Sequence, residues 1–187
     1  MSPRRIVFIR HGKPKIVEGV PSAQWQLSDE GRKAASALAE NFRDYDFSAI
    51  ATSPEPKAVG TAQAIASQLN LPIETDAGLA EHARHSAGYM SREDLEAGVA
   101  RLFASTSALV FGDETADQAF ARFAAALDRQ AAKGGRDVMV VTHGTILSLY
   151  LGRVAGIDPL PFWRALPTPA AIVLEDGKLR RADARPA

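Results

Sequence analysis

The sequence contains no cysteine, which excludes several classes of site and of enzyme. A chain without cysteine has no disulfide framework, no thiolate zinc site, no iron–sulfur cluster and no cysteine nucleophile. Long apolar runs are also absent, because no uninterrupted run exceeds five residues. Neither a secretory signal nor a membrane span is therefore predicted. We expect a cytoplasmic protein that has no membrane partner.

An excess of charge of either sign is missing as well. The chain has 22 Lys and Arg against 22 Asp and Glu, so its formal net charge is zero. Such a chain has no overall field to attract nucleic acid, and any anion site must be local. With 187 residues, 46% hydrophobic and 24% charged, it has the size and composition of one globular domain. We therefore expect a single domain over residues 1–187 and no nucleic-acid partner.

Short apolar runs alternate with helical patterns along most of the chain. Residues 6–9 and 137–142 are rich in β-branched and other apolar residues, which predicts strands buried on both faces. Further strands are predicted at 48–53, 72–75, 170–175 and 178–181, and helices at 28–43, 57–69, 116–133 and 146–154. This alternation favours an α/β fold, a three-layer α/β/α sandwich with a mostly parallel central sheet.

Residues 76–114 are less regular than the rest. They mix histidine, arginine and glycine and show a helical pattern only at 91–103. We interpret 76–114 as an inserted cap over the active site.

Two of the predicted strands are followed by the same dipeptide. His11-Gly12 follows the first strand, and His143-Gly144 follows a second strand far along the chain. Ligands of a parallel sheet bind outside the carboxyl ends of its strands, so we expect both histidines at one site. Arg10 stands directly before His11, and a histidine beside a guanidinium suits an anion-facing nucleophile or acid/base group.

The motifs around these dipeptides resemble those of the histidine phosphatase superfamily, the group that includes the phosphoglycerate mutases. The similar segments occur in the family's order, and they are Ile6 to Gly12, Leu27-Ser28 with Gly31, Thr52-Ser53-Pro54 with Thr61-Ala62, Leu79-Ala80-Glu81, and Val140 to Gly144. Together the similarity extends from residue 6 to about residue 174. The resemblance implies a phosphoglycerate mutase-like fold and phosphoryl-transfer chemistry without a cofactor or a metal ion.

The resemblance also implies roles for the matching residues. His11 would be the nucleophile and would become a phosphohistidine that water later hydrolyses. Arg10 and His143 would bind the phosphoryl oxygens. Glu81 would be the general acid that protonates the leaving oxygen and then the base that activates water. This role requires Glu81 to be protonated in the first step.

Three further residues are candidates for phosphate binding. Gly12 would let a ligand approach the backbone, and N–H groups near Gly144 would add hydrogen-bond donors. Lys57 stands where the family usually carries a second phosphate-binding arginine. It would retain the positive charge without the two-pronged guanidinium grip. The alternative for Lys57 is an ordinary lysine on the face of a helix.

Departures from the family pattern favour a phosphatase over a mutase. Lys13 follows Arg-His-Gly where mutases and many phosphatases have Glu or Gln, and Val17 stands where many members have asparagine. We therefore predict an enzyme, a metal-independent phosphatase that acts on phosphomonoesters or phosphohistidine. The alternatives are a non-catalytic phosphate-binding or regulatory module and, less favoured, a phosphoglycerate mutase. The partner would be a small phosphorylated substrate or a phosphoprotein, and a homodimer is compatible with the sequence.

Several other side chains admit two interpretations. His82 and His85 invite a metal site, but they are three residues apart, unlike the four-residue spacing of zincins. We favour a cap in which Arg84 or a protonated histidine touches the substrate. Trp25 and Trp163 either line the mouth of the pocket or anchor the packing of loops.

Overall fold

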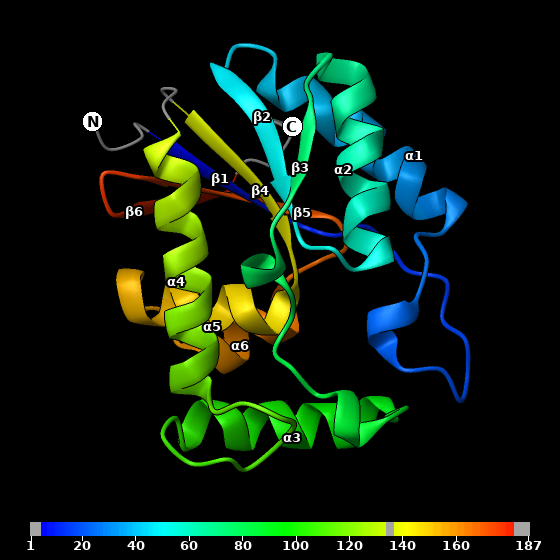
Figure 1. Cartoon of the computed structure of the whole chain (residues 1–187), viewed down its shortest axis with the longest axis vertical. Helices are drawn as coiled ribbons and strands as arrows, with labels where there is room; N and C mark the ends of the chain where they lie inside the picture. Colours follow the sequence, from blue (N-terminus) through cyan, green and yellow to red (C-terminus); the bar gives the residue numbers. More distant parts are fainter. Residues whose placement is uncertain (1–4, 134–136, 182–187) are drawn as a thin grey trace.

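The centre of the protein is a six-stranded mixed sheet with the strand order β3-β2-β4-β1-β5-β6 (Figure 1). The computed structural model describes residues 5–133 and 137–181. The strands are β1 (Arg5–Arg10), β2 (Phe47–Thr52), β3 (Ile73–Thr75), β4 (Asp137–Thr142), β5 (Ala170–Glu175) and β6 (Lys178–Arg181). The first four in sequence pair in parallel, and β5 and β6 add antiparallel strands at one edge. The prediction of a mostly parallel sheet is confirmed.

Helices cover both faces of the sheet and make the outer two layers (Figure 1). They are α1 (Asp29–Leu38), α2 (Pro56–Leu69), α3 (Arg92–Ala104), α4 (Ala116–Ala132), α5 (Gly144–Ala155) and α6 (Pro159–Ala165). Short 3-10 helices occur at Ser22–Gln24, Ala39–Phe42, Ala77–Leu79 and His85–Ala87. The core side chains of α1 and α2 pack on one face, and those of α4 and α5 pack on the other. The three-layer prediction is therefore confirmed.

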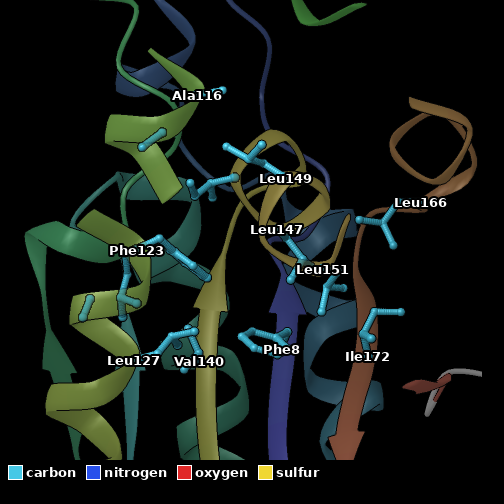
Figure 2. Packing of buried hydrophobic residues seen from close by; sticks show 14 of the residues in the cluster. Phe8, Ala116, Phe123, Leu127, Val140, Leu147, Leu149, Leu151, Leu166 and Ile172 are labelled. Carbon is cyan, nitrogen blue, oxygen red and sulfur yellow. The ribbon is translucent and has the colours of Figure 1, made fainter. Parts of the chain in front are cut away.

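The alternation of side chains along β1 divides the core into two clusters. Phe8 points to the face under α4 and α5, where it packs with Phe123 and Leu147 (Figure 2). Val7 and Ile9 point to the opposite face, toward α1 and α2. All three β1 side chains are fully buried. Burial on both faces keeps the end of β1, and the residues that follow it, in a fixed place.

The segment predicted as a cap lies at the carboxyl ends of the parallel strands. Its helix α3 crosses that end of the molecule below α4 (Figure 1). Val99 and Leu102 of α3 are fully buried and belong to the same core cluster as Phe8. The segment therefore shares the core of the main fold, and its role as a cap stays a prediction.

Two local features differ from the prediction. The first predicted helix extends as an α-helix only to Leu38 and continues as a 3-10 helix to Phe42. Helix α6 was not predicted; it begins after Asp158, whose side chain accepts the N–H of Leu160, with a proline in its first turn. A helix this short has too little periodicity to be recognised in sequence. Among the described residues, no helix combines the length and apolar character needed to cross a membrane.

Candidate active site

The two His-Gly dipeptides meet because their strands are neighbours. Strands β1 and β4 pair in parallel, with Arg10 opposite Thr142. The backbone N–H of His11 donates to the carbonyl of Thr142, 3.0 Å away, which continues the ladder past the strand ends. As a result, the ring centroids of His11 and His143 lie 5.1 Å apart. The sheet register therefore builds one site from segments more than a hundred residues apart, as expected from the sequence.

The ring of His11 is oriented by its own backbone. Its Nδ1 lies 2.8 Å from the carbonyl oxygen of Gly12. Because a carbonyl oxygen only accepts, Nδ1 carries the proton of the neutral ring and the lone pair is on Nε2. Burial, helped by the nearby His143 and Lys57, lowers the pKa of His11 well below its ordinary value. The ring is thus neutral, and its lone pair is on Nε2.

His143 is held from its other nitrogen. Its Nε2 lies 2.7 Å from the Ser53 hydroxyl and 3.4 Å from a carboxylate oxygen of Glu55. Its Nδ1 is buried and has no hydrogen-bond partner among the described residues. Burial and the charge of Lys57 lower the pKa of His143 well below its ordinary value. An unsatisfied ring nitrogen beside His11 is a position at which a ligand would supply the missing partner.

Arg10 lies against the start of α5. Its guanidinium donates to the carbonyl of Leu166, while its Nε is buried without a partner in the described part of the chain. A Cβ on Gly144 would lie 3.1 Å from that Nε, so the absence of a side chain there admits the guanidinium. Burial lowers the pKa of Arg10, and the charge of Glu81 opposes this effect. Gly144 therefore contributes by making room for a cation.

The predicted phosphate role of Gly12 does not fit its contacts. Its backbone N–H donates to the Thr61 hydroxyl over 2.9 Å and is not free for a ligand. A Cβ at Gly12 would lie 2.8 Å from the carbonyl oxygen of Gly31 and 2.9 Å from a methyl group of Leu27. This glycine instead allows the loop after β1 to pack closely against the start of α1.

Lys57 is in the site, but its ammonium group is already occupied. The side chain is 4% exposed, which corrects the alternative of a solvent-facing helix lysine. Its Nζ donates to the Ser22 carbonyl at 2.7 Å and forms an ion pair with Glu55. Its charge still acts on both site histidines. A Lys57–Glu55 pair therefore stands where the family has a single arginine cation.

Glu81 is held as a carboxylate, contrary to the protonated state that its predicted acid role requires. One oxygen accepts the backbone N–H groups of His82 and Ile146, each over 2.9 Å, and the other accepts that of Thr145 over 3.1 Å. Arg84 lies 3.6 Å from the carboxylate. Burial favours protonation, but the charge of Arg84 and the N–H groups outweigh it and hold the pKa of Glu81 well below its usual range. Two N–H groups at the start of α5, expected near Gly144 to receive phosphate, are therefore taken by Glu81.

Residues on α4 and before it support Glu81, and the sequence analysis missed them. The Arg122 guanidinium donates to the carbonyls of Gly78, Ala80 and Glu81 at 2.8, 3.0 and 3.1 Å. It also forms an ion pair with Glu114. Arginine on an amphipathic helix gives no sequence signal of this role, because the carbonyls that it binds lie about forty residues away. Only the knowledge that α4 packs against residues 78–81 could have revealed this role of Arg122.

The site residues surround a cavity of about 150 Å³. It is lined on its polar side by Arg10, His11, Lys57, Glu81, Arg84, Gly144 and Thr145. Arg84 Nη1 and the Thr145 hydroxyl are buried without a partner in the described residues, as is Arg10 Nε. Five of the predicted site residues thus line one cavity, and His143 lies behind this lining, beside His11. An adjoining cavity of about 350 Å³ shares Ser22, Glu81, Arg84 and Gly88.

The remaining candidate residues are two histidines outside the 150 Å³ cavity and two tryptophans in its lining. His82 is buried, stacks on Phe111 with ring centroids 5.4 Å apart, and its Nε2 lies 2.9 Å from the Glu114 carbonyl. His85 is exposed. In the described part of the chain, no three His, Asp or Glu side chains are grouped to hold a metal ion. Trp25 and Trp163 both line the 150 Å³ cavity.

Comparison with known proteins identifies the family. A model described as "Histidine phosphatase superfamily (branch 1)" matches residues 6–178. The chain belongs to the histidine phosphatase superfamily, branch 1. The resemblance inferred from the two His-Gly motifs is confirmed.

Individual relatives agree with the family but leave the substrate open. The uncharacterized protein Rv0525 of Mycobacterium tuberculosis is 32% identical over 87 residues, which cover 45% of this chain and 43% of that protein. The mycobacterial glucosyl-3-phosphoglycerate phosphatase Rv2419c with VO3 has a TM-score of 0.74 and 20% identity over 98% of this chain and 99% of its own. A mutant phosphoserine phosphatase of Entamoeba histolytica with phosphoserine has a TM-score of 0.71 and 15% identity, covering 95% and 94%. At these identities the solved structures share the fold.

Proposed function

We propose that the protein is a phosphatase that hydrolyses phosphomonoesters through a phosphohistidine at His11. One observation carries this proposal: the Nε2 lone pair of a buried, neutral His11 adjoins the unpartnered donors of Arg10 and Arg84 and the ring of His143, whose Nδ1 has no partner among the described residues. A tetrahedral oxyanion group is the ligand that would satisfy such donors around a nucleophile.

In the first half of the reaction, Nε2 of His11 attacks phosphorus and the bond from phosphorus to the leaving oxygen breaks. The hydrogen bond from Nδ1 to the Gly12 carbonyl holds the ring in line and stabilises the charge that the ring acquires. Arg10 and His143 bind the equatorial oxygens, where charge increases in the transition state. Lys57, which is paired with Glu55, contributes through the electrostatic field of its ammonium group.

In the second half, a water molecule attacks the phosphohistidine and inorganic phosphate leaves. Glu81 is already a carboxylate in the free protein, so it can accept the proton of that water. The bond between phosphorus and Nε2 breaks, and the lone pair returns to His11. The ionised carboxylate is in the protonation state that the base half of the predicted role requires, although the contacts that keep it ionised also weaken it as a base.

The test is release of inorganic phosphate from p-nitrophenyl phosphate and a panel of phosphomonoesters and phosphohistidine, with a chelator present. We expect release by the wild-type protein and none by His11→Ala, with equal folding of both proteins checked by circular dichroism. The rival, a non-catalytic phosphate-binding module, predicts saturable binding of vanadate without turnover. That result from a folded wild-type protein would replace the phosphatase by the binding module.

A further inference from the structure

The 150 Å³ cavity has apolar as well as polar lining residues. Trp25, Met90, Leu95 and Trp163 line it together with the phosphoryl-binding residues. The Trp25 indole is fixed by its Nε1, which donates to the Val20 carbonyl over 2.9 Å. A cavity of about this size with apolar walls is enough for a benzene-sized group. Indole rings in the wall of a cavity favour a flat aromatic guest.

The charges of the cavity leave little attraction for a second anionic group. Lys57 is paired with Glu55, and Arg84 lies beside Glu81. The ion pairs found in the described part of the chain leave Arg10 without a carboxylate partner. One uncompensated cation suits a single phosphoryl group, so the rest of the substrate is expected to be uncharged.

The side chains near the leaving oxygen also restrict which leaving groups the site can accept. Glu81 accepts three backbone N–H groups, two of them at the start of α5, and every one of these bonds favours the ionised carboxylate. A group held in this way has no proton to donate to a departing alkoxide. Arg84 Nη1, in contrast, is a buried donor without a partner in the described residues, on the same cavity wall. A guanidinium there can stabilise a leaving oxygen that departs as an anion.

We propose that the preferred substrates are monophosphate esters of phenols, whose ring lies between Trp25 and Trp163 and whose oxygen leaves as a phenolate stabilised by Arg84. The inference rests on the proposed phosphatase function and names its substrate class. The bond between phosphorus and the phenol oxygen breaks with its electron pair on oxygen as the bond to His11 Nε2 forms. Water later supplies the hydroxyl of the phosphate, and the proton that it passes to Glu81 finally neutralises the phenolate through solvent.

Three esters of similar size separate the two parts of this proposal. Phenyl phosphate has a flat ring and a phenolate leaving group, benzyl phosphate has the ring but an alkoxide, and cyclohexyl phosphate has neither. General acid catalysis supplies about 10²-fold or more, so esters that need it should suffer by that factor. We expect kcat/KM for phenyl phosphate to exceed that for benzyl phosphate by about a hundredfold, with cyclohexyl phosphate lower still.

Single substitutions test which residues cause the preference for a flat ring and for a phenolate leaving group. Trp163→Leu should lower kcat/KM for phenyl phosphate about tenfold, the loss expected from removal of one aromatic contact, and Trp163→Phe should recover part of it. The control is Tyr89→Leu, an exposed aromatic residue on the cap outside the cavity lining, and it should leave kcat/KM unchanged. Arg84→Gln should steepen the dependence of kcat/KM on the pKa of the leaving phenol. Glu81→Gln should lower kcat without changing that dependence.

The outcomes separate this inference from the function on which it rests. Phosphate release at equal kcat/KM from phenyl and benzyl phosphate would overturn the phenol preference and leave the phosphatase intact. The same holds if Trp163→Leu behaves like Tyr89→Leu, or if Glu81→Gln slows poor leaving groups more than good ones. No release from any ester by a folded protein that binds vanadate would overturn both proposals.

Discussion

The dipeptide His-Gly occurs twice at the end of a buried parallel strand, yet its two copies are built into the site in different ways. His11 is oriented through Nδ1 by its own backbone and leaves the Nε2 lone pair for chemistry. His143 is oriented through Nε2 by Ser53 and has an unpartnered Nδ1. The first arrangement suits a nucleophile and the second suits a group that binds.

The two glycines differ in the same manner. Gly12 faces the body of the protein, where its N–H donates to Thr61 and its Cα packs against Gly31. Gly144 faces the site, where its missing side chain makes room for Arg10. Identical dipeptides at equivalent strand ends therefore perform four distinct tasks, because the neighbours of β1 and β4 differ.

The largest expected effect separates the two histidines. His11→Asn should lower kcat by about 10³-fold or more, because it removes the nucleophile, and an alkaline quench, in which phosphohistidine is stable, should trap no phosphoenzyme. His143→Asn should lower kcat by roughly 10²-fold, because it removes one charge-stabilising contact. Rapid-quench kinetics with radiolabelled substrate measures both. Equal losses, or a phosphoenzyme formed by His11→Asn, would contradict the division of roles.

The glycines should separate stability from binding. Gly12→Ala places a Cβ within 2.9 Å of Gly31 and Leu27 and should cost about 1–3 kcal/mol of unfolding free energy. Gly144→Ala displaces the Arg10 guanidinium and should mainly weaken inhibition by inorganic phosphate. Urea denaturation and phosphate titration measure the two effects. A reversal of this pattern would show that Gly12, and not Gly144, adjoins the phosphoryl group.

In their effect on stability at low pH, the two histidines should behave alike. Burial lowers the pKa of both below the ordinary value, so below about pH 6.5 the unfolded chain binds protons that the folded protein does not. Each histidine should therefore reduce the unfolding free energy by up to about 1.4 kcal/mol per pH unit as the pH falls.

Urea unfolding of the wild type, His11→Asn and His143→Asn between pH 8 and pH 5 measures these slopes. Each variant should show a shallower slope than the wild type. His82, whose pKa is also lowered by burial, is present in all three proteins and cancels from the comparison. A variant that keeps the wild-type slope would mean that the pKa of its histidine is not lowered in the folded protein.

The smallest effects concern the hydroxyl groups behind each motif. Ser53→Ala removes the partner of His143 and should lower activity, whereas Thr61→Val removes the acceptor of the Gly12 N–H and should lower mainly stability. Each loss should be about 1 kcal/mol, as for a single buried hydrogen bond. Parallel assays of kcat and of urea midpoint test the contrast, which fails if both variants lose activity equally.

Much of the fold follows from local patterns. The runs at 6–9 and 137–142 have the composition of strands buried on both faces, and the helices between them have long apolar stripes. The helix at 91–103 was predicted within one residue of α3. Helix α6 was missed because its seven residues depend on a capping aspartate and a proline more than on periodicity.

The site was less predictable where its properties depend on groups brought from elsewhere. Glu81 was placed correctly in the pocket, but its charge is set by the N–H groups of α5 and by Arg84. Lys57 was predicted as a candidate replacement for arginine, and this stays a prediction, but its ion pair with Glu55 was not foreseen. Neither outcome can be read from one segment alone.

The sequence by itself determined the family, the two-histidine site and the alternation of strands and helices, because motifs and periodicity are local properties of the chain. Tertiary structure alone decided which nitrogen of each histidine has a protein partner, which glycine lines the cavity and which carboxylate is held ionised. These properties depend on hydrogen bonds and burial between distant segments, and their energies exist only after the chain has folded.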